Sequence, residues 1–217
     1  MTSSVGSFVE IDFADPANPV IEKLDFDFAS CGYALCIVDT GGSHSDLTDE
    51  YAAVRKEMES VAEYLGKSVL REVDEDEFMK NIADIRSSCG DRAVLRAMHF
   101  YGDNARVEKQ AAALKAGDFE TFKKYIIESG RSSYMYNQNV YSCKKASEQP
   151  VSLALSLSEK LLDGCGAWRV HGGGFAGTIQ AFVPLNKLDE YKDLMEKVFG
   201  SGSCYILSVR PVGGVEL

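Results

Sequence analysis

The chain lacks several features that mark common protein classes. It has no apolar run of the length of a membrane span and no charged-then-apolar signal at its N-terminus, so we expect no membrane partner. Lys and Arg total 23 against 33 Asp and Glu, which gives a net charge of −10. This balance argues against a nucleic-acid surface, which needs a basic stripe. Nucleotide binding is not excluded, because a short loop can hold phosphate within an acidic protein.

Paired cysteines and well-known catalytic motifs are missing too. The sequence has no C-x-x-C pair and no Gly-Lys-Ser/Thr of a Walker P-loop, and no Ser-His-Asp or metal-ligand spacing stands out. Several of the six cysteines lie in or beside apolar runs. We therefore expect reduced thiols in a cytoplasmic protein, without a disulfide framework or a metal site. The six are Cys31, Cys36, Cys89, Cys143, Cys165 and Cys204.

What remains is the composition of an ordinary globular protein. The 217 residues are 45% hydrophobic and 26% charged, enough for one large domain or two small ones. Residue periodicity predicts strands at 7–13, 20–28, 33–38 and 205–209. It predicts helices at 48–65 (with Thr48 as N-cap), 76–87, 91–115 (with a possible break near Gly102), 119–128, 151–162 and 188–199. Residues 132–149 read as a long polar loop.

A glycine cluster interrupts the last part of the chain. Gly172, Gly173 and Gly174 lead into Phe175, Gly177 follows, and an apolar run lies on each side. This pattern predicts a strand, a tight loop and a second strand. Successive backbone N–H groups in such a loop can cradle an anion, and the alternative is a plain hairpin turn. The order strand–loop–strand–helix–strand behind a helical block predicts an α+β fold with a ferredoxin-like split β-α-β sandwich.

The glycine stretch resembles the third motif of the GHMP kinases, in particular the galactokinase pattern R-x-T-G-G-G-F-G-G-C. The chain reads Arg169-Val170-His171-Gly172-Gly173-Gly174-Phe175-Ala176-Gly177-Thr178. It departs from the pattern at His171, Ala176 and Thr178, and the methyl group of Ala176 would narrow the loop.

Further fragments resemble galactokinases in the same order along the chain. The loop after these fragments departs from the family, because it lacks the usual Pro-Glu-Leu-Asp. The matching fragments are His44-Ser45, Asp49-Glu50-Tyr51, Leu70-Arg71-Glu72-Val73, Arg92-Ala93 to His99 with Asn104-Ala105-Arg106-Val107, Asp118-Phe119, and Glu128-Ser129-Gly130-Arg131-Ser132-Ser133.

Two motifs of the galactokinase N-terminal half are absent from the sequence. They are the sugar-holding G-R-x-N-L-I-G-E-H-T-D-Y and the phosphate-binding P-x-G-x-G-L-S-S-S-A. Met1 to Gly6 resembles the residues just after the family's catalytic G-x-M-D-Q segment. The resemblance thus implies the C-terminal half of a galactokinase. Residues 1–40 would be strands from the end of the N-terminal domain, and residues 41–217 would be the C-terminal domain.

The resemblance also implies a chemistry for the intact enzyme, the transfer of the ATP γ-phosphoryl group to the anomeric hydroxyl of galactose with Mg²⁺. The catalytic base would lie in the missing half, so we expect no catalytic residue and no activity in this chain alone, and no tightly bound cofactor. Tyr51 would help position galactose, and Gly172, Gly173, Gly174, Phe175 and Gly177 would line the active site. Tyr51 also begins the apolar stripe of its own helix, so a core role is the alternative.

Other readings stay open. The chain could be a non-catalytic sugar-sensing or interaction module, or belong to another GHMP sugar kinase such as an N-acetylgalactosamine kinase. Partners would be galactose, ATP and the missing half, with self-association through the uncovered N-terminal strands. His44 and His99 could be bases, but structural roles are favoured for both, and His171 beside the glycine loop could contact phosphate. The acidic run Asp74 to Glu77 reads as a solvated helix start rather than a cation site.

Overall fold

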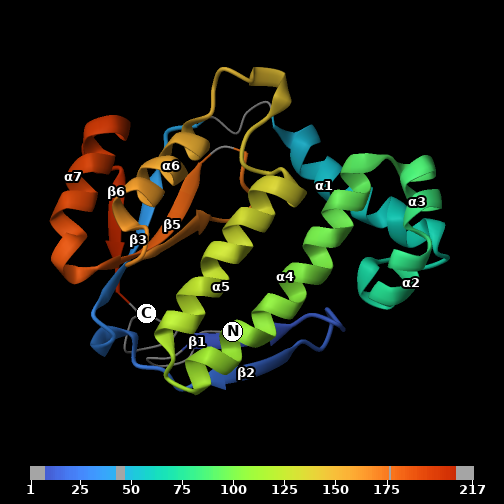
Figure 1. Cartoon of the computed structure of the whole chain (residues 1–217), viewed down its shortest axis with the longest axis horizontal. Helices are drawn as coiled ribbons and strands as arrows, with labels where there is room; N and C mark the ends of the chain where they lie inside the picture. The colour runs from blue at the N-terminus through green and yellow to red at the C-terminus, as the bar shows by residue number, and fades with distance from the viewer. Residues whose placement is uncertain (1–7, 43–46, 176, 209–217) are drawn as a thin grey trace.

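The fold is centred on a four-stranded antiparallel sheet. The structure is a computed structural model, and it describes residues 8–42, 47–175 and 177–208 (Figure 1). The strand order is β4-β5-β3-β6. The strands are β3 (Tyr33–Asp39), β4 (Ala167–Val170), β5 (Thr178–Pro184) and β6 (Cys204–Leu207). With helices between β3 and β4 and another between β5 and β6, this is the ferredoxin-like arrangement that the sequence predicted.

Seven helices lie in the described part of the chain. They are α1 (Thr48–Tyr64), α2 (Glu75–Lys80), α3 (Ile82–Cys89), α4 (Asp91–Lys115), α5 (Phe119–Ser132), α6 (Pro150–Leu162) and α7 (Leu188–Phe199). A π-helix, Ser133–Asn137, continues α5. No helix in this part of the chain combines the length and the hydropathy needed to cross a membrane.

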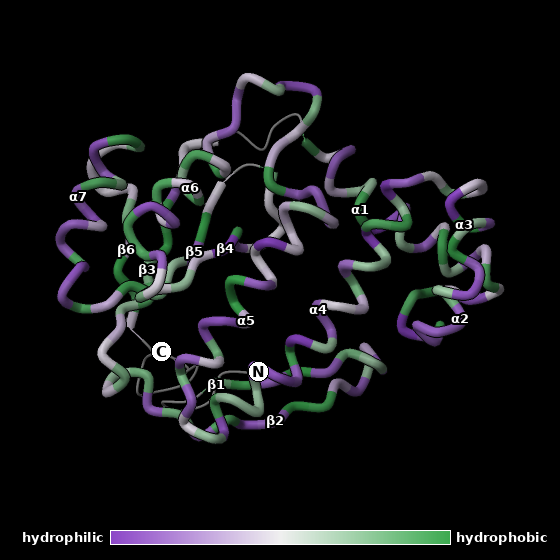
Figure 2. Tube along the Cα trace, viewed as in Figure 1, coloured by the Kyte–Doolittle hydropathy of each residue, from purple (hydrophilic) through white to green (hydrophobic). Residues whose placement is uncertain are grey.

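Each face of the sheet has its own cover. Alternate residues of β3, such as Cys36 and Val38, are fully buried on the face that α6 and α7 cover. On the other face, Leu35 and Phe182 meet a phenylalanine-rich cluster that includes Phe119 and Phe122 of α5. The predicted strand at 33–38 is therefore covered on both sides, more completely by α6 and α7. Figure 2 shows the hydrophobic colour concentrated on these strands.

The two strands nearest the N-terminus pair with one another in a hairpin. β1 (Phe8–Asp12) pairs antiparallel with β2 (Val20–Leu24), and Phe8 lies opposite Leu24. This end of the hairpin packs on the phenylalanine cluster. Other apolar residues of this segment are exposed, with Ile21 47% and Phe13 61% exposed.

The predicted boundary at residue 40 stays a prediction. β3 precedes that boundary, yet it pairs with β5 and β6 as an inner strand of the main sheet. The hairpin β1–β2 shares no strand pairing with that sheet. We propose that a domain boundary between β2 and β3 fits these pairings better.

Several local predictions were wrong. The helix expected at 76–87 is two helices, because the Asn81 side chain donates to the Glu77 carbonyl at 2.9 Å and competes with the backbone at the break. The helix α4 runs unbroken through Gly102, where the Arg106 guanidinium lies against the glycine. Residue 47, not Thr48, is the N-cap of α1.

Two more expectations differ in their bounds. The second strand ends at Leu24 rather than Phe28, because Asp27 caps a short 3₁₀ helix by accepting from the Ala29 N–H at 3.0 Å. The expected loop at 132–149 begins with helical residues, through Asn137. The fragments Met1 to Gly6 and His44-Ser45, and Ala176, lie outside the described residues.

Candidate functional site

The glycine cluster forms the connection between β4 and β5, as predicted. Gly172, Gly174 and Gly177 have φ of +69°, +83° and +107°, a region that side chains other than glycine rarely adopt. Phe175 also has a positive φ, 58°, although it carries a large buried side chain. Gly172 and Gly173 are exposed and Gly174 is buried. The loop therefore presents its first two glycines outward and anchors itself through the next two residues.

Asn139 supplies that anchor. Its carbonyl accepts from the Phe175 N–H at 2.5 Å, and its side-chain Nδ2 donates to the Gly173 carbonyl at 3.2 Å. A Cβ on Gly174 would lie 1.8 Å from the same Asn139 carbonyl oxygen, so only glycine fits there. Asn139 is buried, and its Oδ1 has no hydrogen-bond partner among the described residues. No periodic signal in the sequence marks this residue, which lies within the loop expected at 132–149.

Tyr51 of α1 meets the loop from the other side. Its hydroxyl donates to the Gly174 carbonyl at 2.7 Å, and its ring stands edge-on to Phe175 with centroids 5.3 Å apart. A Cβ on Gly173 would lie 2.7 Å from the Tyr51 ring. Burial raises the pKa of Tyr51, which keeps the phenol protonated as a donor at neutral pH.

The structure thus brings together Tyr51 and the glycine loop, two features far apart in the sequence. Tyr51 also packs in a small cluster with Leu47, Val54 and Phe175, so the expected core role has support as well. Its role in positioning a sugar stays a prediction.

The far end of the loop is tied to β3, because the Thr40 N–H and hydroxyl both donate to the Gly177 carbonyl, at 2.9 and 2.7 Å.

The described histidines have structural partners. His99 is buried, with Nδ1 2.9 Å from the Ser132 hydroxyl, and burial lowers its pKa in opposition to nearby Asp103. His171 is exposed and its Nδ1 lies 3.0 Å from Gln180 Oε1, along the strand pair rather than over the glycines. His44 lies outside the described residues.

The acidic run is a helix start, as the sequence predicted. Asp74 caps α2 by accepting from the N–H groups of Asp76 and Glu77, at 2.9 and 3.3 Å, so the run is a helix start. Within residues 8–42, 47–175 and 177–208, no group of three or more His, Cys, Asp or Glu is placed to hold a metal ion. The described residues therefore offer no such cluster of ligands for Mg²⁺ on their own.

Two hollows meet at Phe175. The larger, about 740 Å³, lies between the end of β3, the segment before α6 and the first turn of α6, and includes Lys144 and Lys145. The smaller, about 320 Å³, lies between α1, α4 and the segment after the π-helix. Since Phe175 of the glycine loop lines both hollows, the shape of each depends on the position of that loop.

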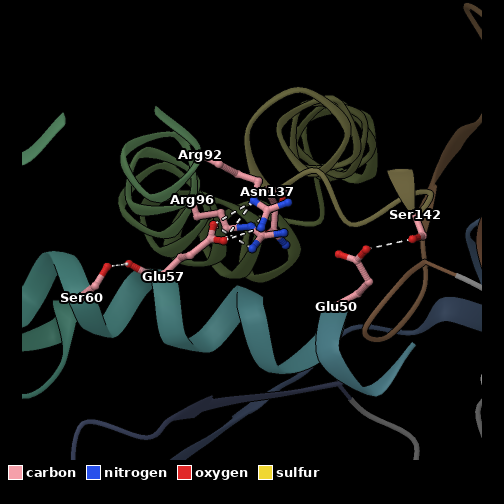
Figure 3. A network of polar contacts seen from close by, with 7 residues as sticks. All are labelled: Glu50, Glu57, Ser60, Arg92, Arg96, Asn137 and Ser142. Carbon is pink, nitrogen blue, oxygen red and sulfur yellow. Dashed lines mark hydrogen bonds and ion pairs between the residues drawn. The ribbon is translucent and has the colours of Figure 1, made fainter. Parts of the chain in front are cut away.

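An ion network holds α1, α4 and the π-helix together beside the smaller hollow. Arg92 donates to Glu57 through Nε at 3.0 Å and Nη2 at 2.5 Å, and Arg96 Nη1 donates to the same carboxylate at 2.9 Å (Figure 3). Arg96 is fully buried and also donates to the Asn137 carbonyl at 3.0 Å. Hydrogen bonding to Glu57 raises the pKa of Arg92, whereas burial lowers that of Arg96.

This network was not recognised in the sequence. The family fragment was matched from Arg92, but Arg96 is the arginine that the fold buries. The sequence did contain a signal for the burial of Arg96, because Arg96 shares one face of α4 with Ala93, Ala97 and His99. A charged residue on a helix face that is otherwise buried needs a partner, and Glu57 is that partner.

Known proteins give this geometry a context. No protein-family model matches the chain. Human galactokinase is 31% identical over 184 residues, which cover 85% of this chain and 44% of that protein. The chain resembles the galactokinases. The galactokinase of Thermosipho africanus is 29% identical over 182 residues, covering 82% and 47% of the two chains, and that of Actinobacillus pleuropneumoniae serotype 5b is 26% identical over 164 residues, covering 76% and 41%.

A solved structure agrees on the fold. The crystal structure of Lactococcus lactis galactokinase complexed with galactose matches with a TM-score of 0.70 at 19% identity, over 97% of this chain and 53% of that one. The predicted galactokinase resemblance and the α+β fold are confirmed. The chain spans about half the length of the galactokinases that it matches, so galactokinase activity does not follow from the similarity alone.

Proposed function

We propose that this chain is the C-terminal portion of a galactokinase, and that the intact enzyme phosphorylates galactose at its anomeric hydroxyl with ATP. The observation that carries the proposal is the galactokinase similarity over most of the chain, which includes the human protein at 31% identity. The contact of Tyr51 with the glycine loop supports it, because it joins two features that the resemblance assigned to one site. A cytoplasmic location would suit such an enzyme.

In this proposal the chain contributes positioning rather than proton transfer. Phosphoryl transfer depends mainly on holding the reactants in line and stabilising charge. Gly172 and Gly173 offer exposed backbone, and Asn139 and Tyr51 hold the loop by hydrogen bonds to the Gly173 and Gly174 carbonyls. ATP bound with Mg²⁺ would supply the phosphoryl group and its charge neutralisation. The general base and the metal ligands are assigned to the other half of the enzyme.

The chain alone is expected to have no sugar kinase activity. Loss of a general base typically lowers a rate about 10²–10⁴-fold, before any loss of substrate binding is counted. The test is transfer of labelled γ-phosphate from ATP to galactose and to N-acetylgalactosamine by the purified chain. The same assay is repeated after the chain is joined to a galactokinase N-terminal segment. Turnover by the chain alone that Gly173→Val abolishes would overturn this assignment.

The rival functions separate in the same experiments. Preference of the joined protein for N-acetylgalactosamine would identify another sugar kinase. The nucleotide sequence upstream of codon 1 tests the remaining alternative, a non-catalytic sugar-sensing or interaction module. An in-frame segment that encodes the two N-terminal motifs supports a kinase, whereas a stop codon and a ribosome-binding site support a sugar-sensing or interaction module.

A further inference from the structure

The smaller hollow beside Phe175 has the chemistry of a binding site. Its lining comes from four separate segments, and it encloses about 320 Å³, the lower end of the range for small-molecule pockets. It brings together a carboxylate, a guanidinium, an amide and three aromatic rings. The residues that matter are Glu50, Arg92, Gln138, Tyr134, Tyr141 and Phe175.

A buried carboxylate faces this hollow. Glu50 is only 9% exposed, and one of its oxygens accepts from the Ser142 hydroxyl at 2.8 Å. Figure 3 shows its other oxygen turned toward the arginine pair of α4. Yet within the described residues no ion pair joins Glu50 to Arg92 or Arg96, because both arginines are bonded to Glu57.

Glu50 and Arg92 carry opposite charges and line the same hollow without forming an ion pair, which leaves room for a bound group to bridge them. Glu50 and Glu57 balance Arg92 and Arg96, so the site as a whole favours neither an anion nor a cation. A hydroxyl group both donates and accepts, and can bond to a carboxylate on one side and a guanidinium on the other. The aromatic rings would cover the apolar faces of a small ring or chain.

We propose that this hollow binds a small neutral polyhydroxylated molecule, with hydroxyls that donate to Glu50 and accept from Arg92. The site goes beyond the proposed kinase function. Its lining includes neither Tyr51 nor Gly172 nor Gly173, and only Phe175 is shared with the glycine loop. An occupant would therefore press on the loop from behind, through the Phe175 ring.

The chain carries its own reporter for this site. Cys143 lines the hollow and is exposed, whereas the other five cysteines are buried or half-buried. The full chain is treated with N-ethylmaleimide, and the alkylation of the Cys143 peptide is followed by mass spectrometry. The probes are galactose, glucose and myo-inositol, with inorganic phosphate as an anionic comparison at equal ionic strength. Saturable slowing of Cys143 alkylation by a polyol, and none by phosphate, is the expected result.

A matched pair of variants on α1 localises the effect. Glu50→Gln keeps the shape and an oxygen for Ser142 but removes the charged acceptor, and should raise the polyol concentration needed for protection at least about tenfold. Glu59→Gln, on an exposed pair with Arg55, should leave it unchanged. Thermal melts of both variants verify that they fold.

Three outcomes overturn the proposal. They are no protection of the wild-type chain by any of the polyols, protection by phosphate instead, and equal protection of the wild type and a folded Glu50→Gln variant. If Glu50→Gln does not fold, the wild-type experiment still decides, since it needs no substitution. The readout does not involve phosphoryl transfer, so failure of the kinase proposal leaves this test intact.

Discussion

Replacing Gly174 by alanine tests how the glycine loop is held. The substitution adds one methyl group at a position with φ of +83°, where that methyl would lie 1.8 Å from the Asn139 carbonyl oxygen. Gly172→Ala is the matched control. Its φ of +69° is equally unfavourable for alanine, but no atom lies within 4 Å of the added methyl group.

The structure separates two contributions to the loss of stability. A non-glycine residue at positive φ costs about 1–2 kcal/mol, and both variants bear that term. In Gly174→Ala the loop must also leave Asn139, which breaks the bond from the Phe175 N–H and leaves buried polar groups unpaired, at about 1–3 kcal/mol more. For a chain of this size, each kcal/mol lowers the melting temperature by roughly 2–4 °C.

Urea unfolding of the two variants, with calorimetry as a second readout, measures the difference. We expect Gly174→Ala to be the less stable variant by at least about 1 kcal/mol. Equal free energies of unfolding would refute the close contact with Asn139. A larger loss in Gly172→Ala would mean that the exposed part of the loop, rather than its buried part, determines stability.

Three further predictions concern the rest of the chain. Burial lowers the pKa of His99 despite Asp103, so the unfolded chain takes up that proton first. Stability should fall as pH drops below about 6.5 and level off below the folded-state pKa, with no such slope in His99→Gln; a slope that persists in the variant would contradict this. In a chain joined to a galactokinase N-terminal segment, Gly173→Val should cause a large loss of kcat/KM and only a small loss of melting temperature, because the valine side chain meets the Tyr51 ring. A large loss of stability with unchanged kcat/KM at low temperature would show that the loop is only structural. The isolated chain should self-associate through the hairpin β1–β2, where Val20 is 68% exposed; a clean monomer in light scattering at high concentration, with no binding of a hydrophobic dye, would count against this.

Much of the fold could be predicted because periodicity reports which side of an element is buried. The strand at 33–39 and the helix ending before Gly200 follow directly from residue spacing and a glycine stop. The break at Asn81 was not predictable in this way, since it depends on one side chain bonding to its own helix. Nor does periodicity show that α4 continues through Gly102, where the Arg106 guanidinium lies 3.2 Å from the position a Cβ would take.

The candidate site was predictable in part. The glycines and Tyr51 were identified through the family resemblance, and the structure places them in contact. Asn139 was missed because its contacts, through its backbone carbonyl and its side-chain Nδ2, are with a loop more than 30 residues away in the sequence. Glu50 entered the sequence analysis only within the fragment Asp49-Glu50-Tyr51, and its burial against Ser142 depends on a segment more than 90 residues away.

The sheet also has a consequence for how the chain is made. Its inner strand β3 pairs with β5 through contacts such as Asp39 with Thr178, so the partner strand is synthesised long after β3 itself. At about 5–20 residues per second, β3 leaves the ribosome roughly ten seconds before β5 exists. During that interval its apolar edge has no native neighbour, while the local contacts of α4 and α5 can already form. We therefore expect the hairpin β1–β2 and the helices, whose contacts are local, to form before the main sheet does.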